Sequence, residues 1–285
     1  MGHKKQHASS NKDRLLKKEA SFHDAMASMI QINDHLALKY LAFDSPGSDM
    51  ADCLPRLKRT ILQTLGDVSG KRVLVYGCGN DNAAVWFSKS GAEVDAIDIS
   101  PISVENQRAI AEKLGLRINA LVMDAHRLDL RSEEYDIVYG NAILHHLVLA
   151  DAVSEIVRVL KPDGKAVFRD VLSGNLFLRA FRFATPFWRT PDEHPLTKSD
   201  FDMFAQRFST GETTFYILSG LPYFGFARIM NHVILRRLGV KFRVPVHETI
   251  YDCFDRLDTL LFRHIPSLQR QAWLCLIVLK KTPAA

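Results

Sequence analysis

The stretch Val73–Ser100, VLVYGCGNDNAAVWFSKSGAEVDAIDIS, decides the fold. It starts within an apolar run, Arg72–Tyr76, passes through a turn and an amphipathic segment, Asn82–Lys89, and ends on a second apolar run, Glu93–Asp98. A strand, a helix and a second strand at this spacing indicate a βαβ unit with parallel strands. The glycines of the turn let the backbone bend tightly and approach a ligand without an intervening Cβ.

The same alternation continues along the chain. It predicts a helix near Val104–Leu114, strands at Asn119–Met123 and Tyr135–Tyr139, a helix at Asp151–Leu160 and a strand at Lys165–Val171. Strands alternating with helices favour an α/β fold with a doubly wound, mostly parallel sheet. Thr213–Leu218 is a further strand candidate. Trp273–Leu279 is an unbroken apolar run, which is typical of a strand buried on both faces.

The composition and periodicity of the sequence predict three regions along the chain. Residues 1–20 carry many lysines and are predicted to be a disordered basic leader. Residues 21–66 have helical periodicity broken at Ser45-Pro46-Gly47, with a second helix over Asp49–Leu65, and are predicted to form an N-terminal helical lid. Residues 67–285 form the main domain, with a cap or insertion at about 172–270, where the strand–helix rhythm is lost.

The turn Gly77-Cys78-Gly79-Asn80-Asp81 precedes a helix, and Asp98 follows about twenty residues later at the end of the next strand. An acid there can accept hydrogen bonds from both hydroxyls of an adenosine ribose, or it can simply cap the next helix. A dinucleotide site would need Gly or Ala at Asn82, and Asp81 would repel its phosphates. A positively charged sulfonium nucleoside suits this acidic turn better.

The sequence from Lys71 to Val171 resembles the class I S-adenosylmethionine-dependent methyltransferases, in particular their small-molecule branch. Besides Val73–Ser100, the resemblance rests on Met123-Asp124-Ala125, on Tyr135–Leu147 and on the turn Leu160–Lys165, in the order the family has them. It implies a seven-stranded Rossmann-like sheet of order 3-2-1-4-5-7-6 with an antiparallel strand seven, and S-adenosylmethionine as the cofactor.

The resemblance also implies a set of cofactor-binding residues, with Asp98 on the ribose, Asp124 on the adenine amino group and the Ala125 N–H on the ring. The full set is Tyr76, Gly77, Cys78, Gly79, Asp81, Asp98, Ile99, Asp124, Ala125, Asn141 and His146. Two positions depart from the family, which has an acid at Val75 and a third glycine at Asp81. Asp81 either takes over a contact to the amino group of the cofactor or caps the helix at Asn82.

Four residues are candidates for moving a proton: His145, His146, His194 and Asp170. The histidine pair follows a predicted strand, His194 lies in a proline-bounded loop, and Asp170 ends another strand, where ligands of α/β sheets bind. The histidine pair could instead be bonded to backbone, and His194 could lie in a capped surface turn. Asp170 could orient a substrate or balance the charge of Arg169. The aromatic and basic segment at 176–189 either packs amphipathically on the core or covers an apolar acceptor.

The predicted function is methyl transfer from S-adenosylmethionine to a small, apolar or aromatic metabolite, with secondary metabolism favoured and the O, N or C acceptor atom open. An isoprenoid-quinone methyltransferase and an NAD-dependent oxidoreductase are the alternatives. The net charge is +5, but no aromatic platform accompanies the basic residues, so nucleic acid is not an expected partner. The sequence leaves the oligomeric state open, a homo-oligomer included.

The bulk composition is that of an ordinary globular protein. Hydrophobic residues make up 47% of the 285 residues and charged residues 24%. No apolar run has the roughly 18 residues of a membrane span, so no integral membrane segment is expected. The four cysteines form no CxxC pair, which predicts neither a metal site nor a disulfide framework and favours a cytoplasmic location.

Overall fold

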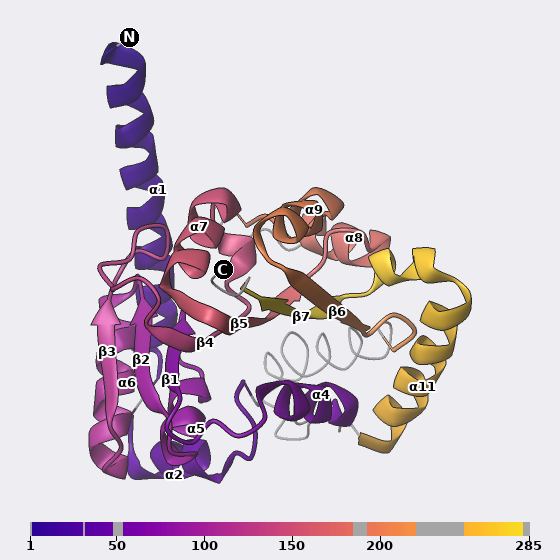
Figure 1. Cartoon of the computed structure of the whole chain (residues 1–285), viewed down its shortest axis with the longest axis horizontal. Helices are drawn as coiled ribbons and strands as arrows, with labels where there is room; N and C mark the ends of the chain where they lie inside the picture. The colour runs from indigo at the N-terminus through magenta and orange to yellow at the C-terminus, as the bar shows by residue number, and fades with distance from the viewer. Residues whose placement is uncertain (1, 31, 48–53, 185–192, 221–247, 282–285) are drawn as a thin grey trace.

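The computed structural model of the chain describes residues 2–30, 32–47, 54–184, 193–220 and 248–281. Its centre is one seven-stranded sheet (Figure 1). The strands are β1 (Arg72–Tyr76), β2 (Glu93–Asp98), β3 (Ile118–Val122), β4 (Tyr135–Asn141), β5 (Leu160–Val171), β6 (Thr210–Tyr216) and β7 (Leu274–Lys280).

The order of the strands is β3-β2-β1-β4-β5-β7-β6, which confirms the predicted topology. Strands β1 to β5 pair in parallel, and β7 runs antiparallel to both β5 and β6. The apolar run predicted as a strand buried on both faces is β7, which lies between two neighbours. The carboxyl ends of β1, β2 and β4 therefore meet at one edge of the sheet, on either side of the point where the strand order reverses.

Alternate strand residues face two hydrophobic clusters, as expected for a sheet covered on both sides. Val73 and Val75 belong to the cluster that includes residues of α4 (Pro55–Leu65), α5 (Ala83–Lys89) and α6 (Pro101–Leu114). Leu74 and Tyr76 belong to the other. That second cluster includes residues of α7 (Leu149–Val159) and α9 (Lys198–Arg207). Burying both faces fixes the strand register, because a slip by one residue would exchange the two sets.

The remaining elements are α2 (Asp34–Ala42), the 3-10 helix η1 (Leu144–His146), α8 (Leu176–Ala184), α11 (Glu248–His264) and the 3-10 helix η4 (Pro266–Gln271). Parts of the predicted cap, residues 185–192 and 221–247, lie outside the described residues, so the boundaries of that cap stay a prediction. Among the helices that are described, none combines the length and the apolar character needed to cross a bilayer.

The N-terminus differs from the prediction. Residues 1–20 were predicted to be a disordered leader, but one helix, α1 (Gly2–Ser28), covers the leader and the start of the lid (Figure 1). Lysine, alanine and leucine are good helix formers, which supports a helix despite the charge. The Asp24 carboxylate anchors α1 by accepting a 2.5 Å hydrogen bond from Ser100 Oγ, at the start of α6, and Asn106 donates to the Ala27 carbonyl at 3.2 Å.

The rest of the predicted lid contains two described helices, α2 and α4. Helical structure stops before Asn33, whose side chain caps α2 by accepting a 2.9 Å hydrogen bond from Leu36 N. The second predicted helix, Asp49–Leu65, begins at Pro55 in the described structure, where the fixed φ of proline suits the first helical position. Residues 48–53 lie outside the described part of the chain.

Candidate functional site

The turn after β1 is built for close approach of a ligand. Gly77 and Gly79 have φ values of +70° and +44°, which favour glycine. A Cβ on Gly77 would lie 2.6 Å from Ile143 Cδ1, whereas a Cβ on Gly79 would meet no atom within 4 Å. The Cys78 N–H donates to the Ile97 carbonyl at 2.8 Å and ties the turn to β2. Gly79 therefore borders open space, and Gly77 marks a tight internal contact.

Asp98 sits at the carboxyl end of β2 and faces this turn. Its carboxylate accepts hydrogen bonds from Gly79 N at 2.8 Å and from Ser100 N at 2.9 Å. Burial raises the pKa of Asp98, although both N–H groups favour the charged form and oppose the shift. The carboxylate thus fixes the turn and still lines the cavity described below.

The loop after β3 supplies the next part of the site. Asp124 Oδ1 accepts from His126 N at 2.9 Å and lies 2.6 Å from His126 Nδ1. Because His126 Nε2 accepts a 2.9 Å hydrogen bond from Val148 N, the ring carries its proton on Nδ1 and donates it to Asp124. Tyr76 supports the same loop, since its buried hydroxyl donates to the Ala125 carbonyl. Tyr76 itself does not line the cavity.

Asp81 joins two parts of the site. Its Oδ1 accepts from Ala83 N at 2.9 Å at the start of α5, and its Oδ2 accepts from Asn141 Nδ2 at the end of β4. Asn141 in turn accepts from Arg169 Nε at 2.6 Å. Asp81 therefore acts as the predicted helix cap and also lines the cavity, so a contact to the amino group of the cofactor stays a prediction.

His145 and Asp170 do not line the cavity, and their role in proton transfer stays a prediction. Asp170 is buried; its Oδ1 lies 2.6 Å from His145 Nδ1 and its Oδ2 accepts from Leu144 N at 2.7 Å. Burial lowers the pKa of His145, but the charge and hydrogen bond of Asp170 outweigh it and raise the pKa. The pair holds η1, which carries His146.

His146 and His194 do line the cavity. His194 is held by a 2.7 Å hydrogen bond from its N–H to the His145 carbonyl. No residue of α8 is among the lining residues, so within the described residues the segment predicted at 176–189 does not cover the cavity. Leu178 packs against the core instead, as in the amphipathic alternative, and residues 185–189 lie outside the described chain.

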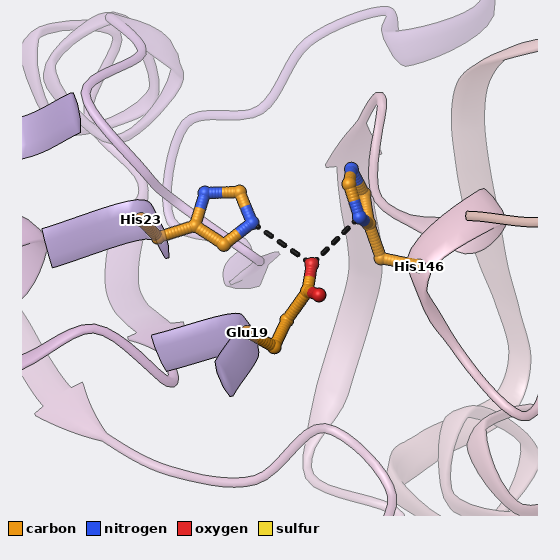
Figure 2. A group of neighbouring side chains, drawn as sticks. All are labelled: Glu19, His23 and His146. Carbon is orange, nitrogen blue, oxygen red and sulfur yellow. Dashed lines mark hydrogen bonds and ion pairs between the residues drawn. The ribbon is translucent and has the colours of Figure 1, made fainter. Parts of the chain in front are cut away.

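Helix α1 forms one wall of the cavity, and this wall begins before residue 21, where the predicted lid starts. It contributes Leu15, Leu16, Glu19 and His23 to the cavity. Figure 2 shows Glu19 between two imidazoles, with its Oε1 3.1 Å from His23 Nε2 and 2.7 Å from His146 Nδ1. Burial raises the pKa of Glu19, but the contacts with His146 and His23 outweigh it and lower the pKa. The hydrogen bond with Glu19 raises the pKa of His23 against the effect of burial.

Together these segments enclose a cavity of about 530 Å³, within the usual range for a small-molecule site. Of the predicted cofactor residues, it is lined by Gly77, Cys78, Gly79, Asp81, Asp98, Ile99, Asp124, Ala125, Asn141 and His146. Residues that the sequence reasoning missed include Glu19, Asn80, Met123, His126, Ile143 and Val148. His126 follows Asp124 by two residues, a spacing that a search for local side-chain bonds could have found.

The comparisons with known proteins agree with this architecture. The family described as "Methyltransferase domain" matches residues 74–168. A "S-adenosyl-L-methionine-dependent Diels-Alderase iccD" from Talaromyces variabilis is 32% identical over 123 residues, 41% of this chain and 42% of the relative. A "Ubiquinone biosynthesis O-methyltransferase" from Alkalilimnicola ehrlichii is 28% identical over 146 residues, 48% of this chain and 59% of the relative. The chain thus spans about half the length of these curated relatives.

Among solved structures, a geranyl diphosphate methyltransferase in complex with its substrate and sinefungin superposes with a TM-score of 0.60. The superposition covers 94% of this chain and 100% of that one at 14% identity, which shows a shared fold. The order of the strands, the glycine turn facing Asp98 and the family match agree. Residues 74–168 therefore match a methyltransferase domain, and the sheet that contains them has the strand order expected of class I S-adenosylmethionine-dependent methyltransferases.

Proposed function

We propose that this protein transfers the methyl group of S-adenosylmethionine to a small, apolar or aromatic metabolite. The observation that carries the proposal is the Asp98 carboxylate, held by Gly79 N at 2.8 Å and facing a cavity in which a Cβ on Gly79 would meet nothing. That arrangement fits a ribose lying over the glycine turn, with its hydroxyls on Asp98. Asp124 and Ala125 line the same cavity, where the adenine would lie.

The charges at the turn suit this cofactor better than a dinucleotide. Asp81 and Asp98 are two carboxylates close to the turn, and Asn82 replaces the glycine or alanine that a pyrophosphate site requires. Carboxylates attract a sulfonium and an ammonium group and repel phosphate. S-adenosylmethionine, when bound, supplies an activated methyl group and leaves as S-adenosylhomocysteine.

The protein itself has to align the acceptor and exclude water. The cavity has apolar walls from both sides of the site: Leu15 and Leu16 on α1, and Leu147 and Val148 after η1. These side chains favour an apolar or aromatic acceptor. An oxygen or nitrogen acceptor loses a proton as it is methylated. Of the four histidines that line the cavity, we propose that His146 or His194 accepts this proton.

A narrower candidate is an isoprenoid-quinone O-methyltransferase. The ubiquinone biosynthesis enzyme among the relatives supports it, together with the leucines of α1 at the cavity wall. This acceptor combines a phenol with an apolar tail. The phenol would give its proton to an imidazole, and the tail would pack against the apolar wall.

The experiment is transfer of a deuterated methyl group from labelled S-adenosylmethionine to pooled acceptors, read by mass spectrometry. The pools are prenylated phenols, unprenylated phenols, amines and a metabolite extract. We expect at least one product that gains one labelled methyl group, and no product with Asp98→Ala. Labelled products that form equally with Asp98→Ala, or no transfer to any pool by a protein that also binds no S-adenosylhomocysteine, would refute the proposal.

A further inference from the structure

Three metal-ligating side chains meet at the wall between α1 and η1. Glu19 and His23 are four residues apart on α1, so both point from the same face of that helix. His146 comes from η1, more than one hundred residues later in the chain. In Figure 2 the carboxylate lies between the two rings, and all three side chains line the cavity.

The donor atoms converge closely. The three ligand atoms lie within 4.8 Å of one another, with Glu19 Oε1 at 3.1 Å from His23 Nε2 and 2.7 Å from His146 Nδ1. The His146 side chain is only 10% exposed, and its Nδ1 atom is buried without a well-directed hydrogen bond to any described residue, despite the nearby carboxylate. His146 Nδ1 and the Glu19 carboxylate are thus close together but not aligned for a hydrogen bond with each other. Two ligands of one metal ion would show this arrangement.

We propose that Glu19, His23 and His146 bind one divalent transition-metal ion, and zinc fits them best. Two imidazoles and one carboxylate are a donor set that zinc uses where a coordination position stays open. Calcium and magnesium prefer sites made of oxygen ligands alone. In a tetrahedral zinc site with bonds of roughly 2 Å, ligand atoms lie about 3.3 Å apart. The two distances from Glu19, 3.1 and 2.7 Å, are near that value, and the imidazole nitrogens lie within 4.8 Å of each other.

The open position of such an ion faces the cavity. If the proposed methyl transfer holds, an acceptor oxygen or nitrogen would occupy that position, and the ion would favour loss of its proton. His194 would remain as the lining imidazole free to accept that proton. The ion would also join α1 to η1, so metal binding would stabilise the position of α1 against the site. Metal binding itself does not depend on which acceptor is used.

The test uses the full-length protein, stripped of metal by a chelator and then dialysed. Zinc binding is measured by calorimetry, and cobalt binding by the visible absorption of low-coordinate Co²⁺ with a nitrogen and oxygen ligand set. We expect one tight site per chain in the wild type. Glu19→Gln and His23→Ala should each lower the affinity of that site by about 100-fold or more, because loss of a ligand costs at least as much as loss of an outer contact.

His264→Ala is the matched control, since it removes an exposed imidazole at the end of α11 that does not line the cavity. It should bind zinc as the wild type does. Thermal unfolding in chelator shows that each variant is folded. Equal zinc affinity in all four proteins, or no site tighter than adventitious surface binding in the wild type, would overturn the proposal.

S-adenosylhomocysteine titrations of the same stripped wild type separate this proposal from the proposed function. Tight zinc binding without binding of S-adenosylhomocysteine would refute the methyltransferase proposal and leave the metal site standing. The reverse result would refute the metal site alone.

Discussion

Asp98 should dominate cofactor affinity, because we propose that its carboxylate holds both ribose hydroxyls. A hydrogen bond to a charged group contributes about 1.5–3 kcal/mol. Two such bonds amount to roughly 3–6 kcal/mol, and at 1.4 kcal/mol per tenfold this is a loss of about 10²- to 10⁴-fold in affinity for Asp98→Ala. Asp98→Asn keeps one acceptor oxygen and should lose only about 10- to 100-fold.

The assay is calorimetric titration with S-adenosylhomocysteine, with circular dichroism to verify folding. Asp95→Asn is the matched control, because Asp95 lies on the same strand, is also buried and does not line the cavity. It accepts hydrogen bonds from Asn119 at 2.6 Å and Tyr135 at 2.7 Å, so this change should lower the melting temperature and leave affinity unchanged. A less than threefold loss for Asp98→Ala, or equal losses at both positions, would refute the ribose assignment.

Two further predictions separate binding from stability and test pH dependence. Gly79→Ala should cost only about 1 kcal/mol of stability, from its positive φ, but lower S-adenosylhomocysteine affinity at least about tenfold because its Cβ enters the open cradle. Gly77→Ala should lower the free energy of unfolding, measured in urea, by about 2–4 kcal/mol, because its Cβ also collides with Ile143. Equal stabilities of the Gly77→Ala and Gly79→Ala variants would contradict this prediction. Burial raises the pKa of Asp136, but the hydrogen bond from Lys161 and other contacts outweigh it and place the pKa below its usual range. The charged Asp136 therefore stabilises the fold fully above its unfolded pKa of about 3.8, and this stabilisation is lost as the pH falls through the lower folded pKa. Asp136→Asn should accordingly destabilise the protein more near pH 6 than near pH 3. An equal loss of stability at both pH values would contradict the assignment.

Much of the sheet could be predicted because its signals are local and repeated. The apolar runs at Arg72–Tyr76 and Glu93–Asp98 bury both faces of parallel strands, so their composition alone identifies them. The position of Trp273–Leu279 inside the sheet follows from the same reasoning. The glycine turn and Asp98 were identifiable because backbone geometry and a fixed spacing require those residue types.

The sequence predicts a helical lid from residue 21 onward, but the part of the cavity wall at residues 15–19 could not be predicted in this way. The lysines around Glu19 indicate a solvated segment, and nothing local shows that the Asp24 carboxylate will dock on Ser100 Oγ. His145 and His146 are adjacent residues of a 3-10 turn, and their ring centroids lie 4.1 Å apart. One ring pairs with buried Asp170 and the other faces the cavity, a choice made by tertiary packing.

The most direct test of the account is calorimetric titration of the wild-type protein with S-adenosylhomocysteine and, separately, with NAD⁺. The cavity between the glycine turn and Asp98 should bind one S-adenosylhomocysteine per chain and show no heat of binding with NAD⁺. Saturable binding of NAD⁺ without binding of S-adenosylhomocysteine would contradict it.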